Sequence, residues 1–289
     1  MPDWSPIYQQ LYDEGVRLRG DPVPTPVSGG DISAAWRLAT DDGDLFMKTG
    51  PLSAVEMFAA EAEGLSEIAQ TGTIHVPQLI ASGATGTAVF LALEWLDLER
   101  ADAAVESRFG EQLAELHHAT SKRYGWHRDN TIGLTPQHNT WSDDWIDFFR
   151  EHRLAFQLRL AAENGFSGEL QERGAQLLKR LPIYFEGVTP AASLLHGDLW
   201  GGNWGCSGGN PVIFDPAVYY GDRETDLAMT RLFGGFGTAF YEAYESSWPL
   251  ADGHQERQHL YQLYHVLNHL NLFGSGYLGG AIRLIDELL

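Results

Sequence analysis

The sequence predicts an α+β fold of two lobes: a small N-terminal lobe with an antiparallel sheet and one main helix, and a larger, mostly helical C-terminal lobe. Two observations lead to this prediction. Short apolar runs separated by glycine- and proline-rich turns fill most of the first third of the chain, as expected for strands. After Leu96 the apolar residues recur with a helical period. We therefore expect lobes at residues 1–95 and 96–289, joined by a hinge near residues 94–97.

The strands of the N-terminal lobe are predicted by turns that alternate with apolar runs. A turn at residues 28–33, Ser-Gly-Gly-Asp-Ile-Ser, precedes the run 34–39, and a second turn at 41–44 precedes the short run 45–48. This alternation is typical of antiparallel strands joined by tight connections. Two further strands are expected around a glycine-rich turn, at residues 77–80 and 88–93.

The main helix of this lobe is predicted to begin near Ser53. Ser53, with Glu56 three residues later, matches a capping box, in which each side chain bonds the backbone N–H of the other residue. We therefore expect Ser53 to be the N-cap. The helix itself is predicted by apolar residues that fall on one helical stripe, at Val55, Phe58, Ala62, Leu65 and Ile68.

The C-terminal lobe is predicted from amphipathic helices and one loop-rich block. The helices are expected around residues 109–116, around 145–152 with Ser142 as the N-cap, and around 259–272. The block at 193–222 lies between the second and third of these helices and is rich in aspartate, asparagine and glycine. A strand-rich first lobe followed by a larger helical lobe is the expected outline.

Composition and charge exclude several classes of protein. The chain has 39 acidic and 19 basic residues and a net charge of -20, so it would repel a phosphate backbone, and nucleic acid is not an expected partner. No apolar run has the length of a membrane span, and the start of the chain lacks the pattern of a secretory signal. We expect a cytoplasmic protein with no membrane partner. The single cysteine, Cys206, excludes an intramolecular disulfide and a cysteine-based zinc site.

The segment that carries chemistry is residues 194–203, Leu-Leu-His-Gly-Asp-Leu-Trp-Gly-Gly-Asn. Phosphoryl transfer needs a carboxylate near the attacking hydroxyl, and oxygen ligands that hold Mg²⁺ against a triphosphate. Asp198 follows His196 by two positions and precedes Asn203 by five, which is the spacing of a kinase catalytic loop. Asp198 is therefore the candidate catalytic base. His196 would brace the loop through hydrogen bonds.

A second oxygen ligand is expected from Asp215. It ends the apolar run 212–214 and lies twelve positions after Asn203. Carboxylate and amide oxygens suit the hard Mg²⁺ ion. Asn203 and Asp215 are therefore the candidate metal ligands.

The N-terminal lobe contains the residues that this interpretation requires. Lys48 ends a short predicted strand, where a kinase places the lysine that holds the α- and β-phosphates of ATP. Glu61, in the following helix, would hold that lysine. Gly29 and Gly30 fall in a turn that could cover the phosphates with backbone N–H groups. The order of turn, lysine, glutamate, hinge, base and metal ligand predicts a bilobal protein-kinase-like fold that uses ATP and Mg²⁺.

The run at residues 196–203 resembles the signature of the fructosamine (ketosamine) kinase family, a branch of the aminoglycoside-phosphotransferase-like kinases. Trp200, directly after His-Gly-Asp-Leu, favours this branch over its relatives. The resemblance covers nearly the whole chain, from about residue 20 to residue 275. Its further matches are Met57-Phe58 with Glu61, and residues 94–96, 109–117, 141–149, 215–217 and 220–224.

The resemblance implies a reaction and several contacts. Members of the family phosphorylate the sugar 3-hydroxyl of ketosamines, which form when glucose or ribose glycates an amine. The product then decomposes and releases the amine, which amounts to deglycation. By this resemblance Asp198 accepts the hydroxyl proton, and Glu94, Trp95 and Leu96 offer backbone hydrogen bonds to adenine. The expected partner is a small-molecule or protein-bound ketosamine.

Three further residues near the motif are candidates for a role, and one of them has two interpretations. Trp200 is either a core residue or an aromatic platform for a sugar ring beside the base. Asp222, in the acidic stretch after the metal ligand, is a candidate substrate contact. Asp226 begins an apolar turn and is expected to make structural hydrogen bonds.

Two other functions stay open at this point. One is another small-molecule kinase of the same fold, acting on an aminoglycoside, choline or homoserine, which the Trp200 signature argues against. The other is a catalytically silent nucleotide-binding module, which usually lacks the lysine, the base or a metal ligand. Some family members carry a cysteine in the phosphate loop that links two subunits. Here the loop has none, so we expect a monomer.

Overall fold

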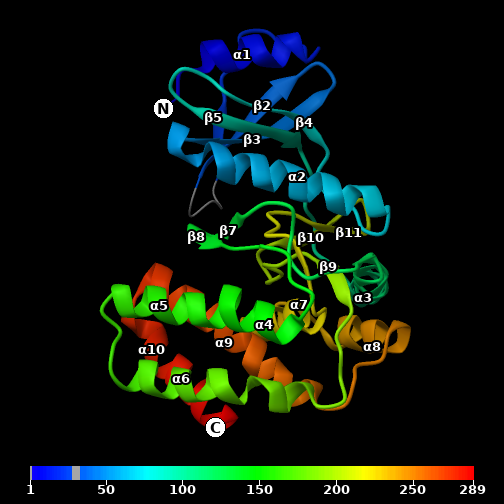
Figure 1. Ribbon diagram of the computed structural model, residues 1–289. Helices are drawn as coiled ribbons and strands as arrows, with labels where there is room; N and C mark the ends of the chain where they lie inside the picture. Colours follow the sequence, from blue (N-terminus) through cyan, green and yellow to red (C-terminus); the bar gives the residue numbers. More distant parts are fainter. Residues whose placement is uncertain (1, 28–32) are drawn as a thin grey trace.

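The computed structural model describes residues 2–27 and 33–289. Figure 1 shows the sheet of the N-terminal lobe stacked above a larger lobe whose lower part is entirely helical. The predicted α+β fold of two lobes is confirmed. Within the described ranges, no helix combines the length and the apolar character that crossing a membrane requires.

The N-terminal lobe is built on one five-stranded antiparallel sheet in the order β1-β2-β3-β5-β4. Lys48 lies on β3 at the centre of this sheet, paired with Ala35 on one side and Leu91 on the other. Its neighbours on both sides hold its backbone in place. The strands are β1 (Thr25–Val27), β2 (Ala34–Thr40), β3 (Gly43–Gly50), β4 (Leu79–Ala84) and β5 (Val89–Glu94).

Three of the four predicted strands are confirmed, within β2, β3 and β5. The strand predicted at 77–80 is displaced, because β4 begins at Leu79 and continues to Ala84 through an irregularity after Leu79. Pro77 has no N–H to donate to a ladder. Gly83, expected in a turn, instead pairs with Phe90 inside the sheet.

The main helix of the lobe is α2 (Val55–Thr71), which lies between the sheet and the C-terminal lobe (Figure 1). The predicted capping box is wrong. Ser53 lies inside a 3₁₀ turn, Leu52–Ala54, and the N-cap of α2 is Ala54, which makes no side-chain bond. The Ala54 N–H donates to the Pro51 carbonyl over 2.9 Å, so the chain enters the helix through this turn.

A second helix, α1 (Trp4–Asp13), is not among the predicted elements and packs on the opposite face of the sheet from α2 (Figure 1). Its buried residues are Ile7 and Leu11. They form a small core with residues of the sheet that include Trp36 and Phe90. Two buried residues give too short a stripe for a helical period to be read from the sequence.

The C-terminal lobe is mainly helical, and the three predicted helices are confirmed within α3, the α4 to α5 region and α9. The predicted cap at Ser142 is wrong. Asp144, directly before α4, is the N-cap and accepts a 2.7 Å hydrogen bond from the Asp147 N–H. The helices are α3 (Ala103–His117), α4 (Trp145–Phe149), α5 (Ala155–Glu163), α6 (Glu169–Arg180), α7 (Glu224–Leu232), α8 (Thr238–Ser247), α9 (His254–Phe273) and α10 (Leu278–Leu288), with a π-helical turn at Arg150–Leu154 and 3₁₀ turns at Leu181–Phe185 and Ser275–Tyr277.

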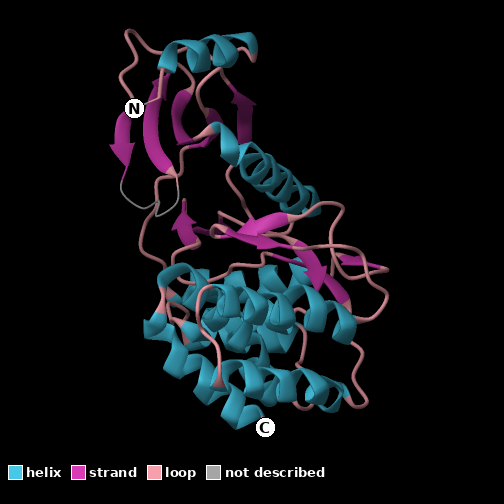
Figure 2. Ribbon diagram, turned by 60° about the vertical axis from the view of Figure 1, so that its left-hand side comes forward, coloured by secondary structure: helices cyan, strands magenta, loops and turns pink. Residues whose placement is uncertain are grey.

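A layer of short strands lies between α2 and the C-terminal helices (Figures 1 and 2). The predicted loop-rich block at 193–222 contributes four of them, so it contains more regular structure than its composition suggests. The strands of the layer are β6 (Thr120–Ser121), β7 (Asn130–Ile132), β8 (Thr135–Gln137), β9 (Ala192–Leu195), β10 (Trp204–Ser207), β11 (Asn210–Ile213) and β12 (Tyr219–Gly221).

The two faces of the N-terminal sheet belong to different cores. The face against α1 has the small core described above. The face against α2 belongs to a much larger core, in which Phe58 and Leu65 of α2 and Leu91 of β5 are joined to residues of the C-terminal helices. Apolar packing is therefore continuous from α2 into the C-terminal lobe.

Candidate active site

Lys48 connects residues from both lobes. Its Nζ lies 2.7 Å from Glu61 Oε1 on α2 and 2.6 Å from Asp215 Oδ1, which follows β11 in the C-terminal lobe. Burial acts to lower the pKa of Lys48, but the two carboxylates outweigh burial and raise that pKa above its usual range. The structure thus brings together three predicted site residues: Lys48, which stays cationic, and the two carboxylates of Glu61 and Asp215 beside it.

The catalytic loop, residues 196–203, leaves β9 and is braced by His196. His196 Nε2 lies 2.9 Å from the Phe214 carbonyl, and the Asp198 N–H donates to His196 Nδ1 over 3.3 Å. Burial, the largest influence on this ring, lowers its pKa, so the imidazole is neutral at pH 7. These bonds tie the loop to the segment that ends in Asp215, and the predicted bracing role of His196 is confirmed.

Asp226 on α7 holds the start of the same loop. Its two carboxylate oxygens accept hydrogen bonds from the N–H groups of His196 (2.7 Å) and Gly197 (2.9 Å), and His117 lies 3.2 Å away. The predicted structural role of Asp226 is confirmed. Gly197 has a φ of 84°, and a Cβ there would lie 2.0 Å from the Ala217 carbonyl oxygen, so the loop requires glycine at this point.

Asp198 lies next to Asn203 in this loop. The Asn203 side-chain amide donates to the Asp198 carbonyl over 2.9 Å and to its Oδ2 over 3.3 Å. Burial, followed by the charges of Asp215 and Asp226, raises the pKa of Asp198 to about 7, while the Asn203 hydrogen bond opposes the rise. A carboxylate with a pKa near neutrality is well suited to accept a proton.

Asp215 has a backbone that L-residues seldom adopt. Its φ is 58°, and no other non-glycine residue among those described has a positive φ. This left-handed conformation is uncommon, although Asp tolerates it better than most residues, and such strain clusters at functional sites. The side chain of Asp215 is 42% exposed, so its carboxylate is accessible from the cleft.

The oxygen donors of Asn203 and Asp215 fit a magnesium ion that is shared with a nucleotide. The described residues contain no group of three His, Cys, Asp or Glu side chains that could hold a metal by itself. Mg²⁺ in kinase sites is bound through only one or two protein ligands, and phosphates and water complete its octahedron. Asn203 and Asp215, which line the same cavity as Lys48, offer two oxygen donors of this kind.

One cavity contains most of these residues. Lys48 and Glu61 lie on its N-terminal side, and Asp198, Asn203 and Asp215 on its C-terminal side. Trp200 also lines it and is 41% exposed, so of its two interpretations the one as a core residue is wrong. The remaining lining residues are Ser33, Ala35, Phe46, Met57, Ala60, Asn130, Thr131, Gly133, Pro216 and Ala217.

The nucleotide contacts predicted for the phosphate loop and for the hinge remain predictions. Gly29 and Gly30 lie outside the described residues. Glu94 ends β5, and Trp95 and Leu96 follow it. Among the described residues that line the cavity, none belongs to this hinge. The Trp95 N–H already donates to the Asp44 carbonyl over 3.3 Å.

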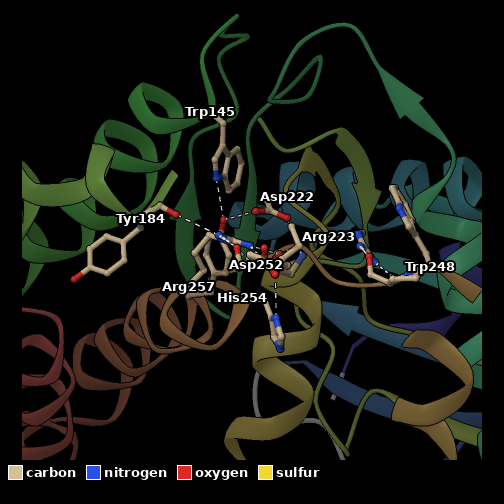
Figure 3. Close-up of polar contacts among 12 residues, drawn as sticks. Trp145, Tyr184, Asp222, Arg223, Trp248, Asp252, His254 and Arg257 are labelled. Atoms are coloured by element: carbon tan, nitrogen blue, oxygen red, sulfur yellow. Dashed lines mark hydrogen bonds and ion pairs between the residues drawn. The ribbon is translucent and has the colours of Figure 1, made fainter. Parts of the chain in front are cut away.

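The structure does not bring Asp222 to the cavity, so its prediction as a substrate contact is corrected. Asp222 is buried, its Oδ2 accepts a 2.5 Å hydrogen bond from the Tyr261 hydroxyl, and its Oδ1 accepts one of 3.0 Å from the Glu224 N–H. Figure 3 shows Asp222 among polar residues of the C-terminal helices. Both carboxylate oxygens are used within the protein, so Asp222 stabilises the start of α7.

Sequence reasoning missed residues of the β7–β8 hairpin that line the cavity. Asn130, Thr131 and Gly133 come from this hairpin, which lies between the lobes. The Asn130 amide donates to the Val218 carbonyl over 2.8 Å, which fixes the hairpin beside the segment after Asp215. Three-residue strands with polar residues carry no clear alternation, so the sequence offered no signal for them.

Comparisons with known proteins agree with this geometry. Residues 8–289 match the family described as fructosamine kinase. A probable ketoamine kinase of Synechocystis sp. is 45% identical over 292 residues, covering 99% of this chain and 97% of that protein. The chloroplastic protein-ribulosamine 3-kinase of Arabidopsis thaliana is 41% identical over 289 residues, covering 99% of this chain and 88% of that protein.

Solved structures show the same relationship. A candidate fructosamine-3-kinase from Haemophilus somnus superimposes with a TM-score of 0.88 at 30% identity, over 98% of this chain and 96% of that one. An aminoglycoside phosphotransferase bound to ADP has a TM-score of 0.60 at 14% identity, over 98% of this chain and 96% of that one. At that identity the second likeness concerns the kinase-like fold alone. The family match and the full-length relatives together show that this chain belongs to the fructosamine kinase family.

Proposed function

We propose that this chain is an ATP-dependent kinase that phosphorylates the sugar 3-hydroxyl of ketosamines, the fructosamine or ribulosamine adducts of amines. One observation carries the proposal beyond family membership. Asp198, Asn203 and Asp215 line the same cavity as the buried Lys48–Glu61 pair. A base, two oxygen ligands and a phosphate-binding cation in one cleft are the parts that phosphoryl transfer requires.

In this proposal the nucleotide binds between the lobes, with the lobe boundary near residue 95. Lys48, held by Glu61, binds the α- and β-phosphates. Gly29 and Gly30 cover the phosphates, and the backbone of Glu94, Trp95 and Leu96 contacts adenine. Asn203 and Asp215 would hold Mg²⁺, which when bound neutralises charge on the triphosphate.

Asp198 is the proposed base. Its pKa of about 7 lets it accept the proton of the sugar hydroxyl as that oxygen attacks the γ-phosphate. The transition state is loose and needs little covalent assistance, so orientation of the hydroxyl by Asp198 and binding of the phosphates by Lys48 supply most of the rate enhancement. Trp200, exposed in the cavity beside the base, offers a flat apolar face to the sugar ring.

The proposal is tested by measuring ATP turnover with Mg²⁺ against ribulosamines, fructosamines, aminoglycosides and choline. The Asp198→Ala variant is the blank for each acceptor. Phosphorylation of a ketosamine well above that blank is the expected result, with phosphate found on the 3-hydroxyl. Turnover of an aminoglycoside or choline alone would refute the ketosamine assignment. No turnover of any acceptor would favour a nucleotide-binding module.

A further inference from the structure

The outer side of α2 carries a second set of carboxylates whose contacts with the C-terminal lobe the sequence did not predict. Glu61 points to Lys48 in the cleft. Glu56, Glu63 and Glu67 of the same helix all contact residues of the C-terminal lobe. α2 is therefore held by polar contacts on two sides, of which only one belongs to the site described above.

Arg128 forms the first part of these outer contacts. Its Nη1 lies 2.5 Å from Glu63 Oε1, and its Nη2 pairs with Glu56, which lies about two turns earlier in α2. His127 Nε2 lies 2.8 Å from the second oxygen of Glu63. The guanidinium of Arg128 is mostly shielded, with 21% of its side chain exposed. One arginine thus bridges two points of the helix, which a single-ended lysine ammonium reproduces poorly.

Glu67 forms the second part. Its Oε2 accepts a 2.5 Å hydrogen bond from Trp126 Nε1, and its Oε1 accepts one of 2.8 Å from the Tyr220 hydroxyl. Trp126 is almost completely buried. Both oxygens of one carboxylate are therefore held by aromatic donors whose rings are anchored in the C-terminal lobe.

Close packing fixes the middle of the helix as well. A Cβ placed on Gly64 would lie 3.1 Å from Val218 and 3.6 Å from Pro216, the residue after Asp215. The absence of a side chain at Gly64 therefore lets α2 pack closely against the segment that follows Asp215. The outer contacts, which we call the α2 clamp, consist of Trp126, His127, Arg128 and Tyr220.

The location of the α2 clamp gives it a consequence for the cleft. The buried core joins α2 to the C-terminal lobe, and the clamp adds fixed polar contacts to that same lobe. Lys48, in contrast, is fixed by the N-terminal sheet. α2 also packs on the N-terminal sheet, so the Lys48–Glu61 distance depends on both lobes, and the clamp sets the contribution of the C-terminal lobe. A small displacement of a positioning group can change rate strongly.

We propose that Arg128, with Trp126, is a positioning residue: it acts through α2 to keep Glu61 against Lys48 and so keeps the phosphate-binding lysine in place. The proposal rests on the proposed kinase function. A purely structural role makes a different prediction: because partly exposed ion pairs stabilise a protein only weakly, it predicts a small fall in Tm and no change in nucleotide affinity. Loss of a positioning contact would instead appear in nucleotide affinity and in the specificity constant for ATP.

The test compares Arg128→Ala with Arg123→Ala and with Arg128→Lys. Arg123 is a matched control, since it lies in the same segment and donates to Asp143 and to the Trp141 carbonyl without touching α2. Three quantities are measured for each variant: kcat/KM for ATP, the Kd of MgADP by calorimetry, and Tm. Arg128→Ala is expected to lower kcat/KM for ATP and MgADP affinity about tenfold or more, with Arg123→Ala unchanged and Arg128→Lys in between.

A double-mutant cycle with Glu61→Gln separates positioning from simple stabilisation. If Arg128 acts through Glu61, Arg128→Ala has little further effect on kcat/KM or MgADP affinity in the Glu61→Gln background. An equal loss in both backgrounds, or a lowered Tm with unchanged MgADP affinity, would overturn the proposal. Wild-type protein that phosphorylates no acceptor would refute the proposed function alone, because MgADP affinity still reports on the clamp.

Discussion

Asp198 and Asp222 are aspartates whose pKa is raised to about 7, in each case chiefly by desolvation, although Asp222 is buried and Asp198 is only partly so. Their surroundings differ. Asp198 lines the cavity beside Asn203, whereas both oxygens of Asp222 accept hydrogen bonds from the start of α7 and from Tyr261. A raised pKa therefore does not identify a base in this protein. The two residues differ in other respects: Asp198 lines the cavity, whereas Asp222 does not and has both oxygens bonded within the protein.

The largest expected effect concerns Asp198. Replacement by Asn keeps the shape of the side chain but removes the proton acceptor, and kcat should fall about 10²–10⁴-fold. Tm should not fall, because the change removes a charge that burial disfavours. Steady-state turnover of a ketosamine and thermal unfolding measure the two quantities. Turnover close to wild type would show that Asp198, like Asp222, is not the base.

The second effect concerns the buried ion pair beside Asp222. Arg257 donates two 2.8 Å hydrogen bonds to Glu224 (Figure 3 shows Arg257), and both side chains are buried. Arg257→Ala leaves the Glu224 carboxylate without its cation and should lower the free energy of unfolding by about 3–5 kcal/mol. Urea unfolding measures this loss. Folded protein should keep a near-normal kcat at low temperature, and a fall comparable to that of Asp198→Asn would contradict a structural role.

The third effect is the pH dependence that Asp222 contributes. Its folded pKa of about 7 lies above the unfolded value, so the folded state binds the extra proton between these values. Its contribution to stability is therefore present at low pH and is lost as pH rises through about 7. Asp222→Asn should destabilise the protein by about 1–2 kcal/mol more at pH 5 than at pH 8, with turnover retained. An equal cost at both pH values would show that Asp222 is ionised throughout.

The smallest effect concerns Tyr261. Its hydroxyl donates to Asp222 over 2.5 Å and accepts from Trp145 Nε1 over 3.0 Å. Tyr261→Phe should cost about 1–2 kcal/mol of unfolding free energy and leave KM for ATP unchanged. The same change should raise the pKa of Asp222 further, since the hydrogen bond from Tyr261 favours its charged form. A changed KM for ATP would connect this network to the cleft.

The surroundings of Asp198 follow from the sequence more readily than those of Asp222, for a physical reason. Asp198, Asn203 and Asp215 lie within one short segment, where spacing along the chain determines which groups meet. The environment of Asp222 depends on Tyr261 and Trp145, which are distant in sequence, so it cannot be read from neighbours. The same limit applies to the α2 clamp, because Arg128 meets Glu56 and Glu63 only after the lobes pack.

The fold shows a similar division between local and distant information. Strands β2, β3 and β5 follow from short apolar runs set between turns, and α3 and α9 from a sustained helical period. The caps at Ser53 and Ser142 are predicted wrongly, because a 3₁₀ turn and the neighbouring Asp144 provide the helix starts instead. In both cases the N-cap lies one or two residues after the predicted one.

The left-handed backbone of Asp215 has an evolutionary consequence. Glycine would adopt a φ of 58° without the steric cost that a side chain carries, but it would also remove the carboxylate that lies 2.6 Å from Lys48 Nζ. An aspartate is retained there only while its carboxylate is useful. Descendants of this chain that lose catalysis should therefore drift at position 215 before they drift at Gly197, whose glycine is required by its positive φ and by close packing.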